Sequence, residues 1–309
     1  MLNSYYFNSV LPVNFMADVF SPPCQPSLRS AQQRALEQGL ARLDAQLLLL
    51  HVLRRPDSDR AWLIAHDELR LTSAQAEQYR ALSARRAQGE PLAYLVGHKA
   101  FFGLDLSVDA RVLVPRPDTE TLVSWALDAA ATYCAATPLA VLDLGTGSGA
   151  IALALAAGLS HSHPLARVQA VDASAPALSV ASGNAHRLGL AVVFVRSNWL
   201  AQVTGQFHLI VSNPPYVAEA DPHLGALAHE PLSALTAGVD GLDDLRRITA
   251  QAPARITPGG WLLLEHGYNQ AGHVSELLAQ AGFTEVTSRR DLAGIPRCTG
   301  GRWPNAPQS

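Results

Sequence analysis

The chain has 309 residues, 48% of them hydrophobic, so it is long enough for one large domain with a smaller partner and can bury a substantial core. Its formal net charge is -3 and its pI about 6.4, which excludes a general attraction to nucleic acid and argues modestly against a duplex-binding enzyme. The three cysteines lack metal-ligand spacing and an even pairing count, which indicates a reducing compartment. Because no apolar run reaches transmembrane length and no basic secretory start is present, we expect a cytoplasmic protein without a membrane partner.

The first third of the chain divides into three segments. Residues 1–28 contain several prolines and no sustained hydrophobic period, so we expect a poorly ordered leader. Residues 29–90 have helical spacing and predict a small N-terminal helical bundle, a candidate substrate-recognition domain. Its three expected helices are LDAQLLLLHVLRR, SDRAWLIAHDEL and TSAQAEQYRALSARRAQG. Residues 91–117 contain short β-prone pieces separated by glycines and predict a β-hairpin linker.

Residues 118–309 alternate between strand and helix patterns, which predicts an α/β domain with a parallel sheet covered by helices on both faces. The expected strands are 139–144, 168–172, 192–196, 208–212 and 261–266, with a final pair between 284 and 303. The expected helices start at 118 and 150 and span 174–188, 241–253 and 270–281. Ligands of such sheets bind at the carboxyl ends of the strands, so functional residues are expected there.

A glycine-rich segment, DLGTGSG at 143–149, closes the first strand of this domain and opens a helix. Alternating glycines let the backbone turn tightly and approach a ligand, while the helix N-terminus offers free N–H groups. Asp172 ends the next strand, where a carboxylate can accept hydrogen bonds from ribose hydroxyls. An ordinary strand-to-helix turn, with Asp172 only as a helix cap, is the alternative.

The spacing of this loop narrows the choice of nucleotide. The Gly-Lys-Ser/Thr of a phosphate-binding Walker loop is absent, and the G-x-G-x-x-G of dinucleotide folds is replaced by G-x-G-x-G behind an Asp. That spacing is similar to the first motif of class I methyltransferases, which bind S-adenosylmethionine. Trp199, in Ser197-Asn198-Trp199 after the third strand, is then expected against the adenine ring. Simple packing at the sheet edge is its alternative role.

The stretch SNPPYV at 212–217 ends a buried strand with an amide, two prolines and an aromatic ring. The proline pair stops the strand and holds the following groups rigidly. A conjugated NH2 group is a poor nucleophile, so its methylation requires acceptors that hold both N–H bonds. The Asn213 oxygen and the Pro214 carbonyl can provide them, and Tyr216 can stack against the planar target. A plain turn is the alternative. Such a clamp suits a glutamine side chain and also the exocyclic amine of adenine or guanine.

At this point six segments, in this order, resemble one family: GEPLAYLVGHKAFFGLDLSVDARVLVPRPDTETLV, VLDLGTGSGAIALALA, SNPPYV, EPLSALTAGVDGLDDLRRI, LLLEHG and RRDLAGIPRCTGGRW. They look like the protein-(glutamine-N5) methyltransferases that modify peptide chain release factors, the HemK/PrmC family. The match runs from about residue 38 to 303, and its most selective element is PRPDTE at 115–120. The resemblance implies a Rossmann-like class I methyltransferase domain with a small N-terminal helical domain. It also implies methylation of the glutamine in a Gly-Gly-Gln loop.

The same resemblance assigns roles to individual residues. The cofactor S-adenosylmethionine would be bound by Gly145, Thr146, Gly147, Ser148, Gly149, Asp172, Trp199 and Asn213. The substrate glutamine would be held by Asn213, Pro214, Pro215 and Tyr216, of which Asn213, Pro214 and Tyr216 are the expected catalytic residues. Two positions depart from the family pattern, since Asn198 stands where Asp is frequent and His229 where an aromatic is common.

Several assignments stay open. Arg116 either forms a structural ion pair with Asp118 or Glu120 or helps to hold the substrate loop, and Glu265 is either functional or an ordinary hydrogen-bonded carboxylate. No metal is expected, because the histidines lack partners at ligand spacing. We expect a monomer whose partners are release factors and not nucleic acid. The rival functions are a DNA or RNA exocyclic-amine methyltransferase, which usually needs a basic face, and a protein that binds the cofactor without turnover.

Overall fold

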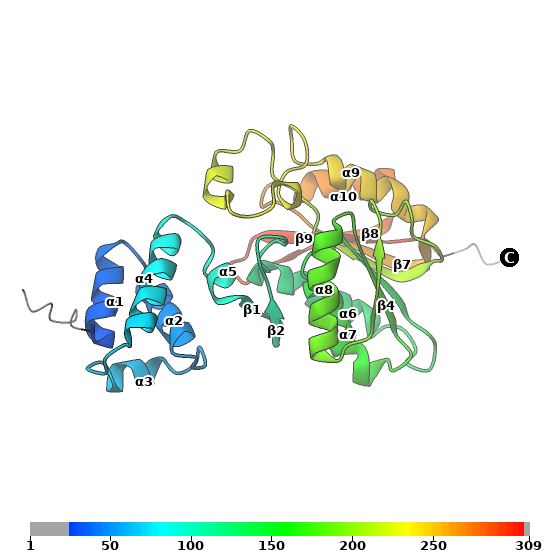
Figure 1. The fold of residues 1–309 in the computed structure, drawn as a ribbon. Helices are drawn as coiled ribbons and strands as arrows, with labels where there is room; N and C mark the ends of the chain where they lie inside the picture. The colour runs from blue at the N-terminus through cyan, green and yellow to red at the C-terminus, as the bar shows by residue number, and fades with distance from the viewer. Residues whose placement is uncertain (1–24, 306–309) are drawn as a thin grey trace, which may run out of the picture. The chain divides into compact units, whose positions relative to one another are not determined.

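The computed structural model describes residues 25–305, which belong to two compact units that divide between Ser83 and Ala84 (Figure 1). Residues 1–24 of the expected leader lie outside the described residues. Its last four residues take part in the first unit: the Ser27 side chain accepts a hydrogen bond from Ser30 N–H at 3.2 Å, and Leu28 begins the first helix. This helix was not among the three expected from the sequence.

The first unit is helical. Its helices are α1 (Leu28–Glu37), α2 (Arg42–Val52), α3 (Arg60–Ala65) and α4 (Ser73–Ala87), the last of which continues past the unit boundary. Thr72 and Gln75 exchange hydrogen bonds of 3.2 and 3.0 Å before α4, a reciprocal cap that satisfies two backbone N–H groups. The Tyr79 hydroxyl of α4 donates to the Ala45 carbonyl of α2 at 3.1 Å. The reciprocal cap thus stabilises the start of α4, and the Tyr79 hydrogen bond joins α4 to α2.

A short helix and a hairpin open the second unit. They are α5 (Leu92–Val96), β1 (His98–Phe101) and β2 (Leu104–Ser107), and the two strands pair antiparallel. Asn184, in α8 (Ala175–Leu188), exchanges hydrogen bonds with the Ser107 backbone and also donates to the Ser148 carbonyl at 3.0 Å. A single buried amide therefore ties the hairpin to the glycine-rich loop.

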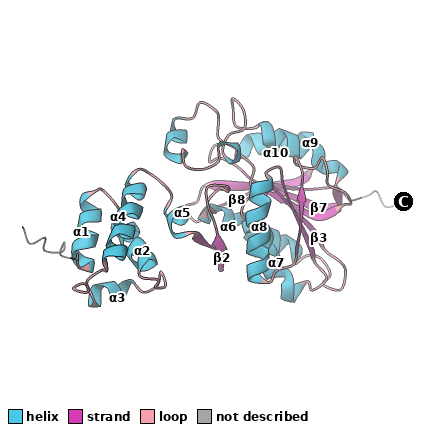
Figure 2. Cartoon of the chain, in the orientation of Figure 1, coloured by secondary structure: helices cyan, strands magenta, loops and turns pink. Residues whose placement is uncertain are grey.

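The strands of the main sheet, magenta in Figure 2, have the order β5-β4-β3-β6-β7-β9-β8. Its strands are β3 (Ala140–Leu144), β4 (Arg167–Asp172), β5 (Val192–Arg196), β6 (Phe207–Ser212), β7 (Ile256–Glu265), β8 (Thr284–Arg290) and β9 (Pro296–Arg302). The first five in the order are parallel, and β9 runs antiparallel to both of its neighbours. The predicted α/β fold is confirmed. The strand order reverses between β3 and β6, and ligands of open sheets bind beside such a reversal.

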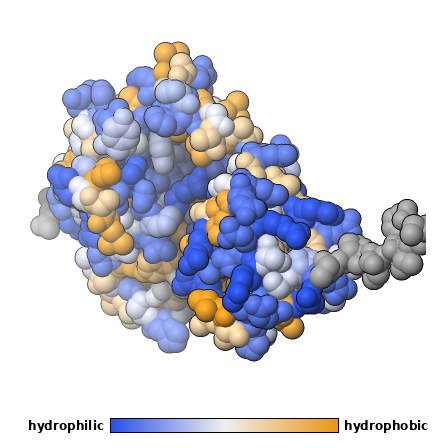
Figure 3. All heavy atoms as spheres, turned by 90° about the vertical axis from the view of Figure 1, so that its left-hand side faces the viewer, coloured by the Kyte–Doolittle hydropathy of each residue, from blue (hydrophilic) through white to orange (hydrophobic). Residues whose placement is uncertain are grey.

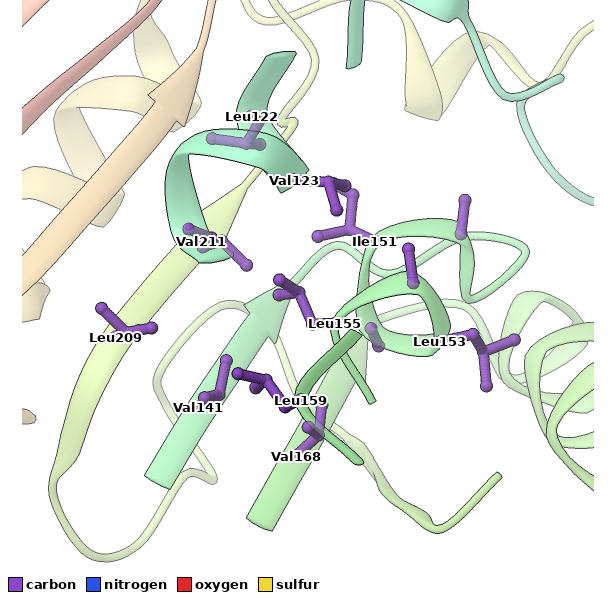
Figure 4. Packing of buried hydrophobic residues seen from close by; sticks show 14 of the residues in the cluster. Leu122, Val123, Val141, Ile151, Leu153, Leu155, Leu159, Val168, Leu209 and Val211 are labelled. Atoms are coloured by element: carbon purple, nitrogen blue, oxygen red, sulfur yellow. The ribbon is translucent and has the colours of Figure 1, made fainter. Parts of the chain in front are cut away.

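Helices cover both faces of this sheet. Successive strand residues point to opposite faces, so they alternate between two hydrophobic cores. Val141 of β3 belongs to the core under α6 (Glu120–Ala130) and α7 (Ala150–Ser162), which Figure 4 shows from close by. Its neighbour Leu142 belongs to the core under α9 (Asp243–Gln251) and α10 (Ala271–Gln280). The 3-10 helices are η1 (Pro117–Thr119), η2 (Pro222–Leu227), η3 (Leu232–Ala234) and η4 (Ala252–Ala254).

The surface is mixed in character. On the face drawn in Figure 3, hydrophilic residues predominate and the hydrophobic ones form separate spots. Within residues 25–305, no helix is both long and apolar enough to cross a membrane.

Candidate active site

A cavity of about 420 Å³ lies at the carboxyl edge of the parallel strands, a volume within the range of small-molecule sites. It contains six of the residues singled out in the sequence: Gly145, Gly147, Asp172, Trp199, Asn213 and Pro215. Thr146, Ser148, Gly149, Pro214 and Tyr216 are not among its lining residues. The structure thus brings the glycine loop, the acidic strand end and the Asn-Pro-Pro segment around one space.

The glycine loop follows β3 in a conformation that requires glycine. Gly145, Gly147 and Gly149 have φ values of 72°, 56° and 85°, in the left-handed region. A Cβ at Gly145 would lie 3.2 Å from the Trp199 ring, and one at Gly149 would lie 3.0 Å from Leu153. A Cβ at Gly147 would meet nothing within 4 Å, so its backbone borders open space. The loop is therefore packed at its two ends and accessible to a ligand at its centre.

Asp143 stabilises the glycine loop through hydrogen bonds. It is fully buried, and its Oδ2 accepts hydrogen bonds from the Thr146 hydroxyl at 2.6 Å and from Ala152 N–H at 3.2 Å. Its Oδ1 has no partner among the described residues. Burial raises the pKa of the Asp143 carboxyl to about 7, and these two hydrogen bonds oppose the shift. The Thr146 side chain therefore contributes to the shape of the loop.

Asp172 ends β4 beside the loop. Its two carboxylate oxygens accept one backbone hydrogen bond each, from Gly147 N–H at 2.9 Å and from Ser174 N–H at 2.8 Å. Each oxygen keeps further lone-pair capacity, since a carboxylate has about four acceptor positions. The backbone contacts orient the carboxylate at the cavity wall, where it can accept from the hydroxyls of a ribose. The chemistry of this wall fits the nucleoside part of S-adenosylmethionine.

Trp199 forms another wall of the cavity. Its indole N–H donates to Asp244 Oδ1 at 3.0 Å, which fixes the ring, and its φ of 50° is unusual for a residue with a side chain. Burial raises the pKa of the Asp244 carboxyl, while this hydrogen bond lowers it. The ring is partly exposed and lies against Gly145. A flat, fixed aromatic face in this position fits an adenine ring.

Asn213 lies where β6 ends. Its side-chain nitrogen donates to the hydroxyl oxygen of Thr119, which is 4% exposed, at 3.2 Å. No hydrogen bond to its side-chain oxygen, or to the Pro214 carbonyl, is formed within residues 25–305. Ser212, one residue earlier, donates from its hydroxyl to the Leu144 carbonyl at 2.8 Å and joins β6 to β3. Two acceptors therefore remain available at the end of β6.

Tyr216 is not among the lining residues of the 420 Å³ cavity. It lines a neighbouring cavity of about 430 Å³, and its hydroxyl lies 3.4 Å from Oε1 of the buried Glu265. Burial raises the pKa of the Tyr216 hydroxyl, and the nearby Glu265 charge raises it further. Burial also raises the pKa of the Glu265 carboxyl to about 7. The Tyr216 side chain thus lines the 430 Å³ cavity and contacts the buried Glu265 carboxyl group with its hydroxyl.

Arg116 forms an ion pair, but with a residue far away in the chain. Its guanidinium lies 2.5 Å from Oε1 of Glu230, and the other oxygen of Glu230 accepts from Val114 N–H at 3.0 Å. The expected partners Asp118 and Glu120 are engaged elsewhere: Asp118 pairs with Arg297 at 3.3 Å, and Glu120 accepts from Phe102 N–H at 2.9 Å. The sequence-based pairing was therefore wrong, because residues 114 positions apart meet only in the fold.

Some lining residues had no assigned role in the sequence. The cavity is also bordered by Arg111, Val112, Leu113, Ser174, Pro231, Ser233, Asp244 and Arg247. Several belong to the segments ARVLVPRP and EPLSAL, which carry the family resemblance but whose side chains follow no chemical motif. Thr119, under Asn213, lies in the selective PRPDTE segment. For the lining residues in these segments, the family resemblance of the segment was the signal in the sequence that could have indicated a role in the site.

Other polar groups near the site have structural partners. His266 is fully buried and its ring contacts the Gly267 carbonyl and the Thr299 hydroxyl at 2.9 and 2.7 Å. Burial lowers the pKa of its imidazole. Across the part of the chain that the structure describes, no group of three or more His, Cys, Asp or Glu side chains could hold a metal ion.

Two family models match this chain. One is described as the PrmC N-terminal domain and matches residues 27–97, and the other is described as the methyltransferase small domain and matches residues 128–233. The first covers the helical unit and α5, and the second covers the glycine loop, Asp172 and the Asn-Pro-Pro-Tyr segment.

Two relatives that cover most of this chain share one name. A protein of Xylella fastidiosa (strain Temecula1), named release factor glutamine methyltransferase, is 48% identical over 274 residues, which cover 87% of this chain and 96% of that relative. One of Bordetella pertussis with the same name is 49% identical over 269 residues, covering 86% and 96%. Among solved structures, the catalytic domain of hMettl16 in complex with MAT2A 3'UTR hairpin 6 has a TM-score of 0.52 at 17% identity, covering 76% of this chain and 83% of that one. That likeness concerns the fold alone.

Proposed function

We propose, since this chain belongs to the release factor glutamine methyltransferase family, that it transfers a methyl group from S-adenosylmethionine to the side-chain amide nitrogen of a glutamine in a peptide chain release factor. The observation that carries this proposal is the orientation of Asn213. Its nitrogen is occupied by Thr119, so its oxygen faces outward as an acceptor at the cavity wall. An acceptor at this position suits a substrate that presents an NH2 group.

S-Adenosylmethionine would occupy the 420 Å³ cavity. The backbone at Gly147 would allow close approach, Asp172 would accept from the ribose hydroxyls, and the adenine would lie against the Trp199 ring, which packs on Gly145. Thr146, Ser148 and Gly149 shape the loop and the start of α7. When bound, the cofactor supplies a sulfonium-activated methyl group.

The acceptor side would work mainly by positioning. A glutamine NH2 is weakly nucleophilic because its lone pair is delocalised into the carbonyl. The Asn213 oxygen and the Pro214 carbonyl would accept its two N–H bonds, and this turns the nitrogen lone pair toward the methyl group. Pro214 and Pro215 hold these acceptors rigidly, since a proline fixes its own backbone torsion. The methylated nitrogen is strongly acidic, so its proton leaves without a strong general base.

The substrate segment would be the Gly-Gly-Gln loop of the release factor, with the helical unit as a recognition domain. We also propose that the protein acts as a monomer in the cytoplasm. Tyr216 would provide a face beside the acceptor segment from the neighbouring 430 Å³ cavity, and Arg116 with Glu230 would hold the segment before α6.

A labelling experiment tests this proposal. The protein is incubated with methyl-labelled S-adenosylmethionine, a purified release factor that carries Gly-Gly-Gln, and total RNA in the same reaction. Mass spectrometry should locate one methyl group on that glutamine and none on a Gln→Glu variant of the factor, because a carboxylate would place lone pairs against the two acceptors. Label found only in nucleic acid would instead favour an exocyclic-amine methyltransferase.

A further inference from the structure

The Asn213 amide rests on a second polar side chain that the mechanism has not used. Thr119 lies in η1 and is 4% exposed, and its hydroxyl oxygen accepts from the Asn213 nitrogen at 3.2 Å. A hydroxyl that accepts in this way still has its own hydrogen to donate. In a buried position, that hydrogen needs an acceptor.

Glu265 offers the acceptor. It is the last residue of β7 and is fully buried. Its Oε1 receives the Tyr216 hydroxyl at 3.4 Å, and its Oε2 has no hydrogen-bond partner among the described residues. The Thr119 hydroxyl is near enough to lower the pKa of this carboxyl group, although no hydrogen bond from Thr119 reaches Oε2 in the structure. A hydroxyl with a spare hydrogen and a buried oxygen with a spare lone pair are therefore neighbours.

We propose that Glu265 is a positioning residue, which acts through the Thr119 hydroxyl to keep the Asn213 side-chain oxygen directed at the substrate glutamine. The proposal rests on the proposed function and deepens it. The Asn213 nitrogen donates to the Thr119 oxygen in the structure, and the proposal adds a hydrogen bond that the Thr119 hydroxyl donates to the Glu265 carboxylate. An ionised carboxylate can only accept, so the hydroxyl must point toward it.

The two amide orientations of Asn213 then differ in energy. With Thr119 committed as a donor to Glu265, its oxygen can only accept, and the Asn213 nitrogen must face it. If the amide turned over, two oxygens would meet without a hydrogen, and the Asn213 nitrogen would face the substrate NH2. A buried group left unpaired in this way disfavours the turned-over amide. The carboxylate thereby selects glutamine over glutamate from behind the site.

The charge state of Glu265 controls this selection. Burial raises its pKa to about 7, Arg297 and the hydroxyls of Thr119 and Tyr216 lower it, and Asp118 raises it. Cys298 lies in β9, opposite Glu265 in the antiparallel register of β7 and β9. Burial raises the pKa of the Cys298 thiol, so the thiol stays uncharged. A protonated Glu265 can donate to Thr119, which then donates to the Asn213 oxygen and reverses the amide. Transfer to glutamine should therefore require the ionised form.

Two substitutions at one position separate this role from packing. Thr119→Val keeps the shape and removes the hydroxyl, whereas Thr119→Ser keeps the hydroxyl. Thr249→Val is the matched control, because Thr249 is buried in α9 and its hydroxyl bonds only to carbonyls of its own helix. We expect kcat with a Gly-Gly-Gln release factor to fall about tenfold or more in Thr119→Val, and to stay near wild type in Thr119→Ser and Thr249→Val. Calorimetry should show unchanged affinity for S-adenosylmethionine in all three.

The second readout is discrimination. The affinity ratio between the Gly-Gly-Gln factor and its Gln→Glu variant should decrease about tenfold in Thr119→Val, because the Asn213 amide can then turn. In the wild type, kcat should fall as the pH drops below about 7, and Glu265→Gln should abolish this dependence. Equal ratios in Thr119→Val and wild type, or an unchanged pH profile in Glu265→Gln, would overturn the inference. A wild-type enzyme that methylates no glutamine would instead overturn the proposed function.

Discussion

Two buried carboxyl groups, Asp143 on β3 and Glu265 on β7, can be compared directly. Both side chains are fully buried, burial raises the pKa of each to about 7, and each has one oxygen without a partner among the described residues. Asp143 belongs to the cofactor half of the site and Glu265 to the acceptor half. They differ in what they hold.

Asp143 binds within its own loop and helix, to the Thr146 hydroxyl and to Ala152 N–H. Glu265 faces Tyr216 and Thr119, which come from other parts of the chain and reach it through side chains. The glycine loop is therefore held by a carboxylate from its own short stretch of sequence. The acceptor half depends on side chains from three segments, so single substitutions and changes of pH should affect it more.

The largest expected effect is on stability and concerns both carboxyls. Their pKa values are about 7 in the folded protein and close to 3.8 and 4.5 in the unfolded chain, so the folded protein binds more protons between about pH 4 and 7. The free energy of unfolding should therefore fall as the pH rises through this window, by up to about 4 kcal/mol for Asp143 and about 3 kcal/mol for Glu265. Denaturation with urea at several pH values measures the slope. Asp143→Asn and Glu265→Gln should each flatten it, and unchanged slopes would refute the buried ionisations.

Asn213→Ala should affect catalysis more than cofactor binding. It removes an acceptor that holds the reacting nitrogen, and a small misplacement can reduce the rate about 100-fold. Single-turnover methyl transfer and calorimetry with S-adenosylmethionine measure the two effects separately. If cofactor affinity decreased as much as the rate did, Asn213 would belong to the cofactor half.

Asp172→Ala tests that cofactor half. Loss of a charged acceptor for the ribose hydroxyls should weaken S-adenosylmethionine binding by about 1–3 kcal/mol. The loss of the hydrogen bonds to Gly147 and Ser174 is part of this effect, and Asp172→Asn, which keeps one accepting oxygen, should lose less. Calorimetry with unchanged affinity in both variants would remove Asp172 from the site.

The smallest effect is expected for Tyr216→Phe. Its hydroxyl contact with Glu265 is long at 3.4 Å, so its loss should cost less than about 1 kcal/mol, and much activity should remain. Tyr216→Ala removes the ring as well and should lower activity far more. Equal losses in the two variants would show that the phenol oxygen is what matters, and would strengthen the link between Tyr216 and Glu265.

Local patterns were enough to predict most of the sheet. The strand at 192–196 was predicted with the bounds that it has in the structure, and the helix expected at 174–188 begins at Ala175 and ends at Leu188. β7 begins at Ile256, five residues before the predicted start, because Pro258 and two glycines hid the strand pattern. Glycine spacing and an acidic strand end likewise indicated residues that line the 420 Å³ cavity, since both signals are local in sequence.

The acceptor half was harder to predict because its contacts join distant segments. Nothing in the sequence around Arg116 indicates Glu230, and nothing around Asn213 indicates Thr119. The flat face expected from Tyr216 depended on the direction of a side chain after a proline pair, which a motif does not specify. The spacing of residues in the sequence predicts which residues end a strand. The side chains that contact those residues from other segments are determined by the packing of the fold.

Trp199 has a consequence for how the protein can be observed. Its ring lines the cofactor cavity, is fixed by Asp244, and is attached to a backbone in a left-handed conformation, which costs about 1 kcal/mol or more. The emission of an indole depends on the polarity of its surroundings and on stacking partners. We therefore expect occupation of the cavity to change the fluorescence of Trp199, and a Trp199→Phe variant, which keeps the other four tryptophans, should lose that change.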